Sequence, residues 1–184
     1  MGHKRILGKT IDFITGREIT DTDDERYRQK LAHILIEEKG YTKGDVEVKR
    51  RIETTVDSNK VLSMVDFVVT VDETAFMVIR YGPGSIVTRE RPALAAARIL
   101  AQYQIPCTIV TNGEDAEILD TLTGKVVGTG IASIPDKSAA RQQLSKIKLQ
   151  HLSPEQSDTE KRILSAYDWL EHSLECDDDW CAEE

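Results

Sequence analysis

The sequence predicts an α/β domain built on a mixed β-sheet and followed by a helical extension. Three apolar, β-branched stretches lie close together between residues 46 and 81, which is typical of an antiparallel meander. An Ala- and Leu-rich stretch at 90–104 then leads into the wholly apolar run 107–111, CTIVT. A strand, a helix and a returning buried strand form a crossover, which joins parallel strands. The sheet should therefore contain antiparallel and parallel pairs.

The N-terminal elements are predicted to be a hairpin and a helix. Residues 11–19, IDFITGREI, read as two short strands around a Thr-Gly turn, where glycine supplies the positive φ. A similar string at 118–127, ILDTLTGKVV, predicts a second hairpin. Thr22 and Glu25 have the spacing of a capping box, so we expect a helix that starts there and ends at Gly40.

The meander contains the first candidate functional residue, Asp66. Residues 54–60 are rich in turn formers and read as a connector, while 72–74 read as a tight turn. An aspartate inside an apolar strand is costly unless it is paired, hydrogen-bonded or bound to a metal. Asp66 therefore needs a partner. The strands of the meander are expected at 46–53, 61–71 and 75–81.

The chain divides into an α/β domain at 1–135 and a helical extension with an acidic tail at 136–184. The extension shows two amphipathic stretches, and the apolar residues of 158–174 can pack on the body or on another chain, which leaves a homodimer open. Residues 171–184 hold seven acidic residues and no Lys or Arg, so the rest of the chain is nearly neutral. A local positive face is therefore possible despite the net charge of -8.

Composition excludes several classes of protein. Among 184 residues, 40% are hydrophobic and 30% charged, as in globular domains, and no apolar run approaches the roughly 18–20 residues that span a bilayer. We therefore expect no membrane association, and a cytoplasmic protein, because the start lacks the apolar stretch of a secretory signal. The three cysteines imply no disulfide framework. Cys176 and Cys181, with His172, could suggest a metal site, but their spacing matches no common zinc pattern.

Four stretches follow one another along the chain: DDERYRQKLAHILIEEKGY, VEVKRRI, VDFVV and TIVTNG. Together they resemble the N-terminal nuclease domain of type I restriction enzyme R subunits, a member of the PD-(D/E)xK nuclease superfamily. The resemblance covers about residues 20–120 and implies a restriction-endonuclease-like fold for 1–135. We expect no helicase domains of the kind found in full R subunits, because the rest of these 184 residues is too short for them. The residues at the family's signature places are Glu25, Arg28, Asp66, Thr111, Asn112 and Gly113.

The resemblance also shows that this sequence lacks two of the family's catalytic residues. In that family the strand after the aspartate strand carries Glu-x-Lys; the two acids hold a divalent metal, usually Mg²⁺, and the lysine polarises water. This sequence has Arg80-Tyr81-Gly82 there. A guanidinium in place of a carboxylate disfavours a metal at Asp66, so we expect no cofactor and a catalytically impaired domain. Arg80 is predicted to pair with Asp66 across neighbouring strands.

Three functions remain open. The first is an impaired nuclease-like domain that binds nucleic acid or a protein partner, for which the anion-binding candidates near the start of the second helix are Arg80, Ser85, Arg89, Arg91 and Asn112. The second is an active, Mg²⁺-dependent endonuclease in which Glu90 or Glu25 joins Asp66. Arginine is a poor substitute for the lysine there, because it stays protonated. The third is a dimeric scaffold assembled through 158–174. Each of these residues also has an ordinary structural role: Glu25 in the capping box, Asn112 in a turn.

Overall fold

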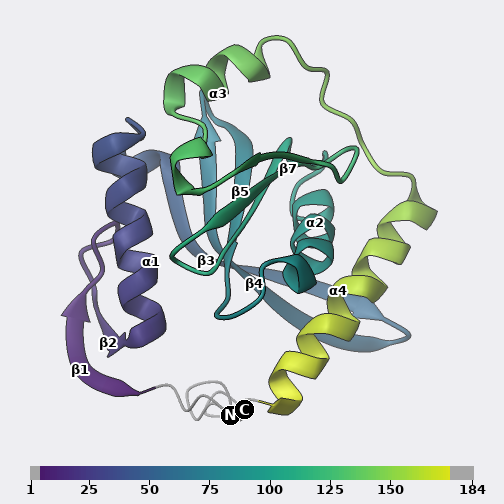
Figure 1. The fold of residues 1–184 in the computed structure, drawn as a ribbon. Helices are drawn as coiled ribbons and strands as arrows, with labels where there is room; N and C mark the ends of the chain where they lie inside the picture. The colour runs from purple at the N-terminus through teal and green to yellow at the C-terminus, as the bar shows by residue number, and fades with distance from the viewer. Residues whose placement is uncertain (1–4, 175–184) are drawn as a thin grey trace.

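We describe the fold from a computed structural model, which covers residues 5–174 and gives the backbone alone at 168–174. The described chain forms a six-stranded mixed sheet with helices on both faces, and a two-stranded sheet beside it (Figure 1). The strands are β1 (Ile6–Ile11), β2 (Glu18–Thr22), β3 (Val46–Val56), β4 (Asn59–Val71), β5 (Thr74–Tyr81), β6 (Cys107–Thr111), β7 (Ala116–Asp120) and β8 (Val126–Thr129). The longer helices are α1 (Asp23–His33), which continues as a π-helical turn at Ile34–Glu38, α2 (Glu90–Ile99), α3 (Lys137–Leu144) and α4 (Pro154–Leu174).

The sheet has the predicted topology. Its strands lie in the order β3-β4-β5-β6-β7-β8, and every neighbouring pair is antiparallel except β5 and β6. Helix α2 makes the crossover between those two parallel strands. The predicted fold class, a mixed α/β sheet with a helical C-terminal extension, is confirmed.

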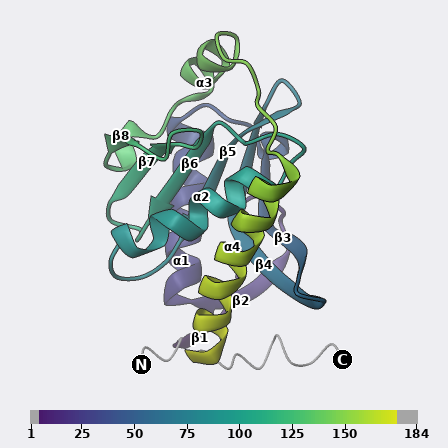
Figure 2. The same cartoon turned by 90° about the vertical axis from the view of Figure 1, so that its right-hand side faces the viewer.

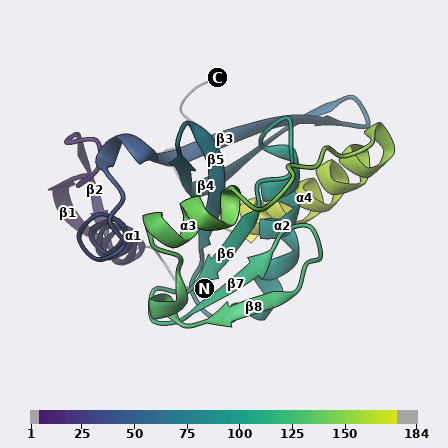
Figure 3. The same ribbon diagram turned by 90° about the horizontal axis from the view of Figure 1, so that it is seen from above.

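Two hydrophobic cores lie on opposite faces of the sheet. Figure 3 shows α1 on one side, and α2 and α4 on the other. The first core takes residues from α1, α3 and the sheet, and the second takes them from α2, α4 and the sheet. Buried members of the first core include Leu31, Leu35, Phe67, Val69, Ile79 and Ala140. Those of the second include Ile52, Val65, Val68, Val78, Ala96 and Leu164.

Both predicted hairpins are formed, and their turns are built alike. Asp12 Oδ1 accepts hydrogen bonds from the backbone N–H and the hydroxyl of Thr15, at 2.6 and 2.8 Å. Asp120 Oδ1 accepts the same two from Thr123, at 2.7 and 2.6 Å. The glycine that follows has a φ of 72° in the first turn and 69° in the second, a region that favours glycine. The repeated Asp-x-x-Thr-Gly pattern is thus a turn motif.

The predicted connector at 54–60 is wrong. β3 and β4 stay paired to their ends, with Thr55 opposite Lys60 and Val56 opposite Asn59. Asp57 and Ser58 alone make the turn, and both have positive φ, as a two-residue hairpin loop of the I′ kind requires. The turn-forming composition marked the loop correctly, but strand pairing extends through the residues around it.

Helix α2 is shorter than the predicted 90–104. It ends at Ile99, and the Ile105 N–H donates to the Ala97 carbonyl at 3.0 Å, so the chain turns back before Pro106. A residue before proline avoids the helical region, which favours this early end. In the extension, the first helix ends at Leu144.

Helix α4 packs on the α/β body rather than standing apart from it. Figure 2 shows it lying across α2. Leu164 is fully buried in the second core, and Glu160 accepts from Arg91 at 2.6 Å and from Arg98 at 2.8 Å. The stretch 158–174 was expected to offer a possible dimer surface. One of its apolar residues, Leu164, is instead buried within this chain. Among the helices of residues 5–174, none is long and apolar enough to cross a membrane.

Candidate functional site

Asp66 lies in β4 between the two cores, and both its oxygens are engaged. Its side chain is 7% exposed. Oδ1 accepts from the Arg28 Nε at 2.5 Å, and Oδ2 accepts from the backbone N–H of Tyr81 at 2.6 Å. The buried aspartate therefore ties α1 to the end of β5, and its charge is met by a guanidinium.

Arg28 connects Asp66 to a second buried carboxylate. Its Nη1 lies 3.4 Å from Glu25 Oε2, and its guanidinium carbon lies 5.3 Å from the centre of the Tyr81 ring. Burial lowers the pKa of Arg28, but the nearby Asp66 and Glu25 outweigh it, and the net pKa is raised. Arg28 therefore stays charged between the two acids.

Glu25 receives a second cation, Lys49, which the sequence analysis missed. The Glu25 side chain is 5% exposed and accepts from Gln29 at 3.0 Å, while Lys49 Nζ lies 3.0 Å from the same oxygen that faces Arg28. Glu25 also completes the predicted start of α1, since its N–H donates to Thr22 Oγ1 at 3.1 Å. Two carboxylates and two cations thus form a charge-balanced cluster, defined as Glu25, Arg28, Lys49 and Asp66.

Lys49 has an unusual backbone that explains how it reaches this cluster. Its φ is 52°, in the left-handed region, which costs a non-glycine residue about 1–3 kcal/mol. Before it, Val48 packs on the α1 core; after it, Ile52 packs on the α2 core. The apolar side chains of β3 therefore change at Lys49 from the α1 face of the sheet to the α2 face. The only sequence signal was a break in alternation within VEVKRRI.

Asp66 pairs with Arg28 of α1, whereas the sequence predicted a pair with Arg80. Ile79 and Tyr81 face α1, through the first core and the Arg28 contact. Since side chains alternate along a strand, Arg80 projects to the α2 face instead. There it is in register with Val110, which pairs in turn with Glu117. Asp66 reaches the α1 face, so the two residues point to opposite sides of the sheet.

Gly82 makes room for Arg89. A Cβ placed on Gly82 would lie 2.2 Å from Arg89 Nη1 and 2.4 Å from its guanidinium carbon, far inside contact distance. Arg89 Nη2 also donates to the Pro83 carbonyl at 3.3 Å. The guanidinium of Arg89 therefore fills the space that any side chain at position 82 would need, including the lysine expected from the resemblance.

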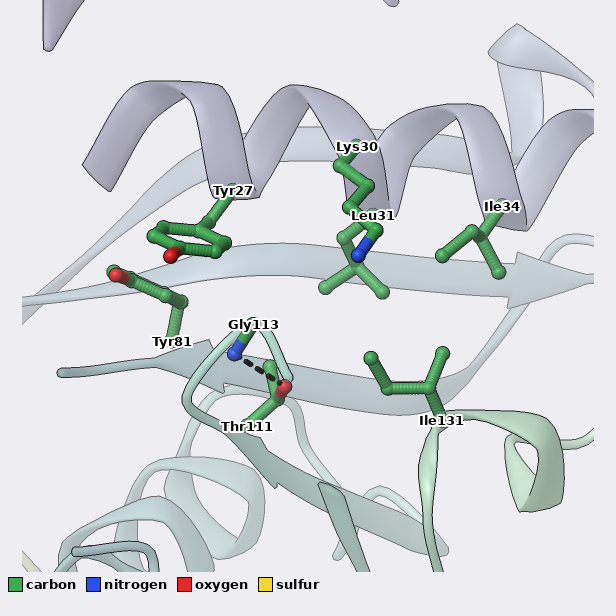
Figure 4. Close-up of a pocket in the computed structure, with 8 residues that line it drawn as sticks. All are labelled: Tyr27, Lys30, Leu31, Ile34, Tyr81, Thr111, Gly113 and Ile131. Carbon is green, nitrogen blue, oxygen red and sulfur yellow. Dashed lines mark hydrogen bonds between the residues drawn. The ribbon is translucent and has the colours of Figure 1, made fainter. Parts of the chain in front are cut away.

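The ends of β5 and β6 close against α1 through an aromatic pair. Figure 4 shows Tyr27 of α1 beside Tyr81, with the loop at Gly113 below them. The two rings stack with centroids 5.8 Å apart, and a Cβ on Gly113 would lie 2.4 Å from the Tyr27 ring. Tyr81 donates to Asp24 at 3.0 Å, and burial raises the Tyr81 pKa. This packing fixes α1 over the charge-balanced cluster.

Comparison with known families agrees with this geometry. A family model described as Type I restriction enzyme R protein N terminus (HSDR_N) matches residues 23–135. The chain belongs to this family. Neither the curated proteins nor the solved structures gave a significant match. The matched range begins at the first residue of α1 and includes the whole six-stranded sheet, so it contains the cluster.

The residues present do not fit the metal site that the restriction enzyme family implies. Such a site needs two carboxylates that are free to bind a cation. Here both Asp66 oxygens accept hydrogen bonds, Glu25 faces two cations, and position 80 is an arginine. Among the side chains of residues 5–167, no three of His, Cys, Asp or Glu form a group able to hold a metal. The side chains of His172, Cys176 and Cys181 lie outside the described residues.

Glu90, the candidate for a relocated active site, lies on the wrong face of the sheet to join Asp66. It begins α2, and its carboxyl group lies close to that of Glu117 on β7. Burial raises the pKa of Glu117 first, and the neighbouring Glu90 raises it further. Arg91 turns toward α4, where Glu160 accepts from it at 2.6 Å. A centre made of Asp66, Glu90 and Arg91 is therefore not assembled.

Ser85 and Asn112 lie in two adjacent loops that follow β5 and β6. Ser85 is exposed, and its carbonyl accepts from Thr88 at 3.1 Å. Asn112 Oδ1 accepts from the N–H groups of Glu114 and Asp115, and its amide donates to the Gly84 carbonyl at 3.4 Å. Asn112 therefore builds its own turn, as predicted, and joins the two loops. We call the surface formed by residues 82–91 the 82–91 edge, and the Asn112 loop lies beside it.

Proposed function

We propose that this chain is an R-subunit N-terminal-like domain that has lost metal-dependent cleavage and acts in the cytoplasm by binding nucleic acid. Family membership supports the domain type. The observation that carries the loss of catalysis is the double engagement of Asp66, by Arg28 and by the Tyr81 N–H. A carboxylate already paired with a guanidinium is largely charge-compensated, so Mg²⁺ has to compete with Arg28 for its negative charge.

The changes at positions 80 and 82 support the same proposal. Arg80 brings positive charge where the family has a metal-binding acid, and Gly82 has no side chain to polarise a water. Arg89 fills the space at Gly82, but a guanidinium stays protonated and is a poor proton acceptor. Positions 80, 82 and 89 therefore supply no group suited to activate water beside Asp66.

The 82–91 edge supports binding as the remaining function. It combines exposed Ser85 with the half-buried guanidinium of Arg89, at the carboxyl ends of neighbouring strands. One arginine guanidinium can donate two parallel hydrogen bonds to a phosphate group, and it needs no metal to do so. Nucleic acid is the ligand that this chemistry and the family membership favour over a protein partner.

The test combines cleavage and binding on the same DNA duplex. We expect no cleavage with Mg²⁺ or Mn²⁺, and salt-sensitive binding that persists in EDTA. Arg89→Ala should weaken binding and reduce the salt dependence by about one released ion, measured by fluorescence anisotropy. Arg162→Ala is the matched control, because Arg162 pairs with Asp57 at the far hairpin tip.

Two results would contradict the proposal. Cleavage that disappears in Asp66→Asn would establish an active nuclease and restore the relocated-centre alternative. Absence of any duplex or single-strand binding in EDTA would remove nucleic acid as the ligand and favour a protein partner.

A further inference from the structure

The outer parts of β3 and β4 form a two-stranded ribbon that projects from the sheet. We define this ribbon as residues 50–56 and 59–65, joined by the turn at Asp57 and Ser58. β5 pairs with β4 only from Phe67 onward, so the ribbon has no third strand among residues 5–174. Figure 3 shows it extending away from the other strands.

The two faces of the ribbon have different surroundings. One face packs on α4, because Ile52 and Val65 share the second core with Leu164. Side chains alternate along a strand, and residues opposite each other in register share a face. The other face, which we call the ribbon face, therefore carries three cross-strand pairs: Arg51 with Met64, Glu53 with Leu62, and Thr55 with Lys60.

The ribbon face is exposed and positive. Its four polar side chains are exposed, whereas the two apolar ones are half-buried and belong to neither core. Among the side chains of residues 5–167, Arg51 and Lys60 have no ion-pair partner. Lys49, at the base of the ribbon, adds a cation that is 44% exposed. Glu53 is the one acid of the three pairs, so the cations outnumber it.

The ribbon has a width and a chemistry that suit the major groove of B-form DNA. Paired strands lie about 4.8 Å apart, and this groove is about 12 Å wide, so it admits a two-stranded ribbon. The minor groove, at about 6 Å, is too narrow. In the major groove, arginine and lysine donate to guanine, as Arg51 and Lys60 could, and Glu53 could accept from the amino group of cytosine. The phosphates on both sides of the groove attract the positive charge of the ribbon face.

We propose that the ribbon face binds duplex DNA in the major groove, with Arg51 and Lys60 as its cationic contacts. This inference rests on the proposed function, because it names the form of nucleic acid and a second contact surface besides the 82–91 edge. It excludes RNA duplexes as ligands of the ribbon, since the major groove of A-form RNA is too deep and narrow for side chains to read.

The experiment measures binding of the full chain by fluorescence anisotropy in EDTA, to a short DNA duplex and to an RNA duplex of the same sequence. We expect Arg51→Ala and Lys60→Ala each to weaken DNA binding about tenfold, and the wild type to prefer the DNA duplex by at least as much. Arg50→Ala is the matched control and should bind like the wild type, because Arg50 pairs in register with Val65 and so lies on the opposite face, where it contacts Glu47 at 2.9 Å.

Competition identifies the groove. Methyl green, which occupies the major groove, should displace the protein, and netropsin, which occupies the minor groove, should not. Displacement by netropsin alone would overturn the inference, as would equal affinity for the DNA and RNA duplexes.

Thermal unfolding checks that each variant is folded, which is expected because Arg51 and Lys60 are exposed. If either alanine variant does not fold, Arg51→Gln or Lys60→Gln replaces it, with the same expected loss. DNA binding that is unchanged in the folded ribbon variants but weakened in Arg89→Ala would overturn the inference and leave the proposed function in place. Absence of any binding by the wild type would overturn both.

Discussion

At the scale of single residues, the decisive feature is the choice of partner for Asp66. A buried acid needs a cation, and the sequence predicted Arg80 for that role. The structure selects Arg28 because Asp66 reaches the α1 face while Arg80 projects to the other. At Lys49, the core-facing side of β3 changes from one face of the sheet to the other. This change depends on the left-handed φ of Lys49, which the strand pattern in the sequence does not reveal.

Arg28→Ala should therefore be strongly destabilising. It leaves Asp66 and Glu25 buried with Lys49 as their remaining cation, and breaking one partner of a buried ion pair costs about 3–5 kcal/mol. Urea unfolding measures the change in the free energy of unfolding. The control is Arg26→Ala on the same helix, whose exposed guanidinium pairs with Asp21. Equal effects of the two substitutions would contradict the assigned role of Arg28.

Gly82 and Arg89 should be energetically coupled. Gly82→Ala places a Cβ where the Arg89 guanidinium lies, so it should cost more in the wild type than in Arg89→Ala, by about 1 kcal/mol. A double-mutant cycle of unfolding free energies measures this. Gly44→Ala, where the nearest atom is 3.8 Å from the new Cβ, should show no coupling to Arg89→Ala. Additive effects at Gly82 would mean that the two positions do not share this space.

The carboxyl pair of Glu117 and Glu90 predicts a pH effect. Burial and then Glu90 raise the Glu117 pKa above its ordinary value of 4.5. A raised pKa stabilises the fold at low pH, and this contribution is lost as the pH rises through the folded-state pKa. Glu117→Gln should therefore unfold at a higher temperature than the wild type at pH 8, with the difference shrinking toward pH 4. Glu114→Gln, exposed in the neighbouring turn, should show no such trend.

At the scale of elements, the helical extension completes the second core. Helix α4 covers α2, buries Leu164 and holds Arg91 and Arg98 through Glu160. The sequence predicted its amphipathic pattern but left open whether its apolar face met this chain or another. For Leu164 the answer is this chain, because Ile52, Val65 and Ala96 offer a matching apolar surface.

Leu164→Ala should consequently destabilise the whole fold rather than α4 alone. Truncating a fully buried leucine costs about 2–5 kcal/mol, and two-state unfolding followed at α4 and in the sheet should shift together. Leu122→Ala is the control, since Leu122 is an exposed residue of the β7–β8 turn. Separate transitions for α4 and the sheet would show instead that the extension is an independent unit.

At the scale of the whole molecule, the order and topology of elements could be predicted, and their ends and partners could not. The helix start at Thr22, the apolar run at 107–111 and the crossover that joins this run to β5 carried the fold. The residues at 54–60 and 100–104 were assigned wrongly, because local composition competes there with strand pairing and with Pro106. Asp66 was identified as the residue to explain, and its partner depended on tertiary geometry.

The most direct test of the account is anomalous diffraction from crystals soaked in Mn²⁺. We predict no anomalous peak within ligand distance of Asp66, and the Arg28 guanidinium in contact with its carboxylate. A peak between Asp66 and Glu25, with Arg28 turned away, would contradict the account.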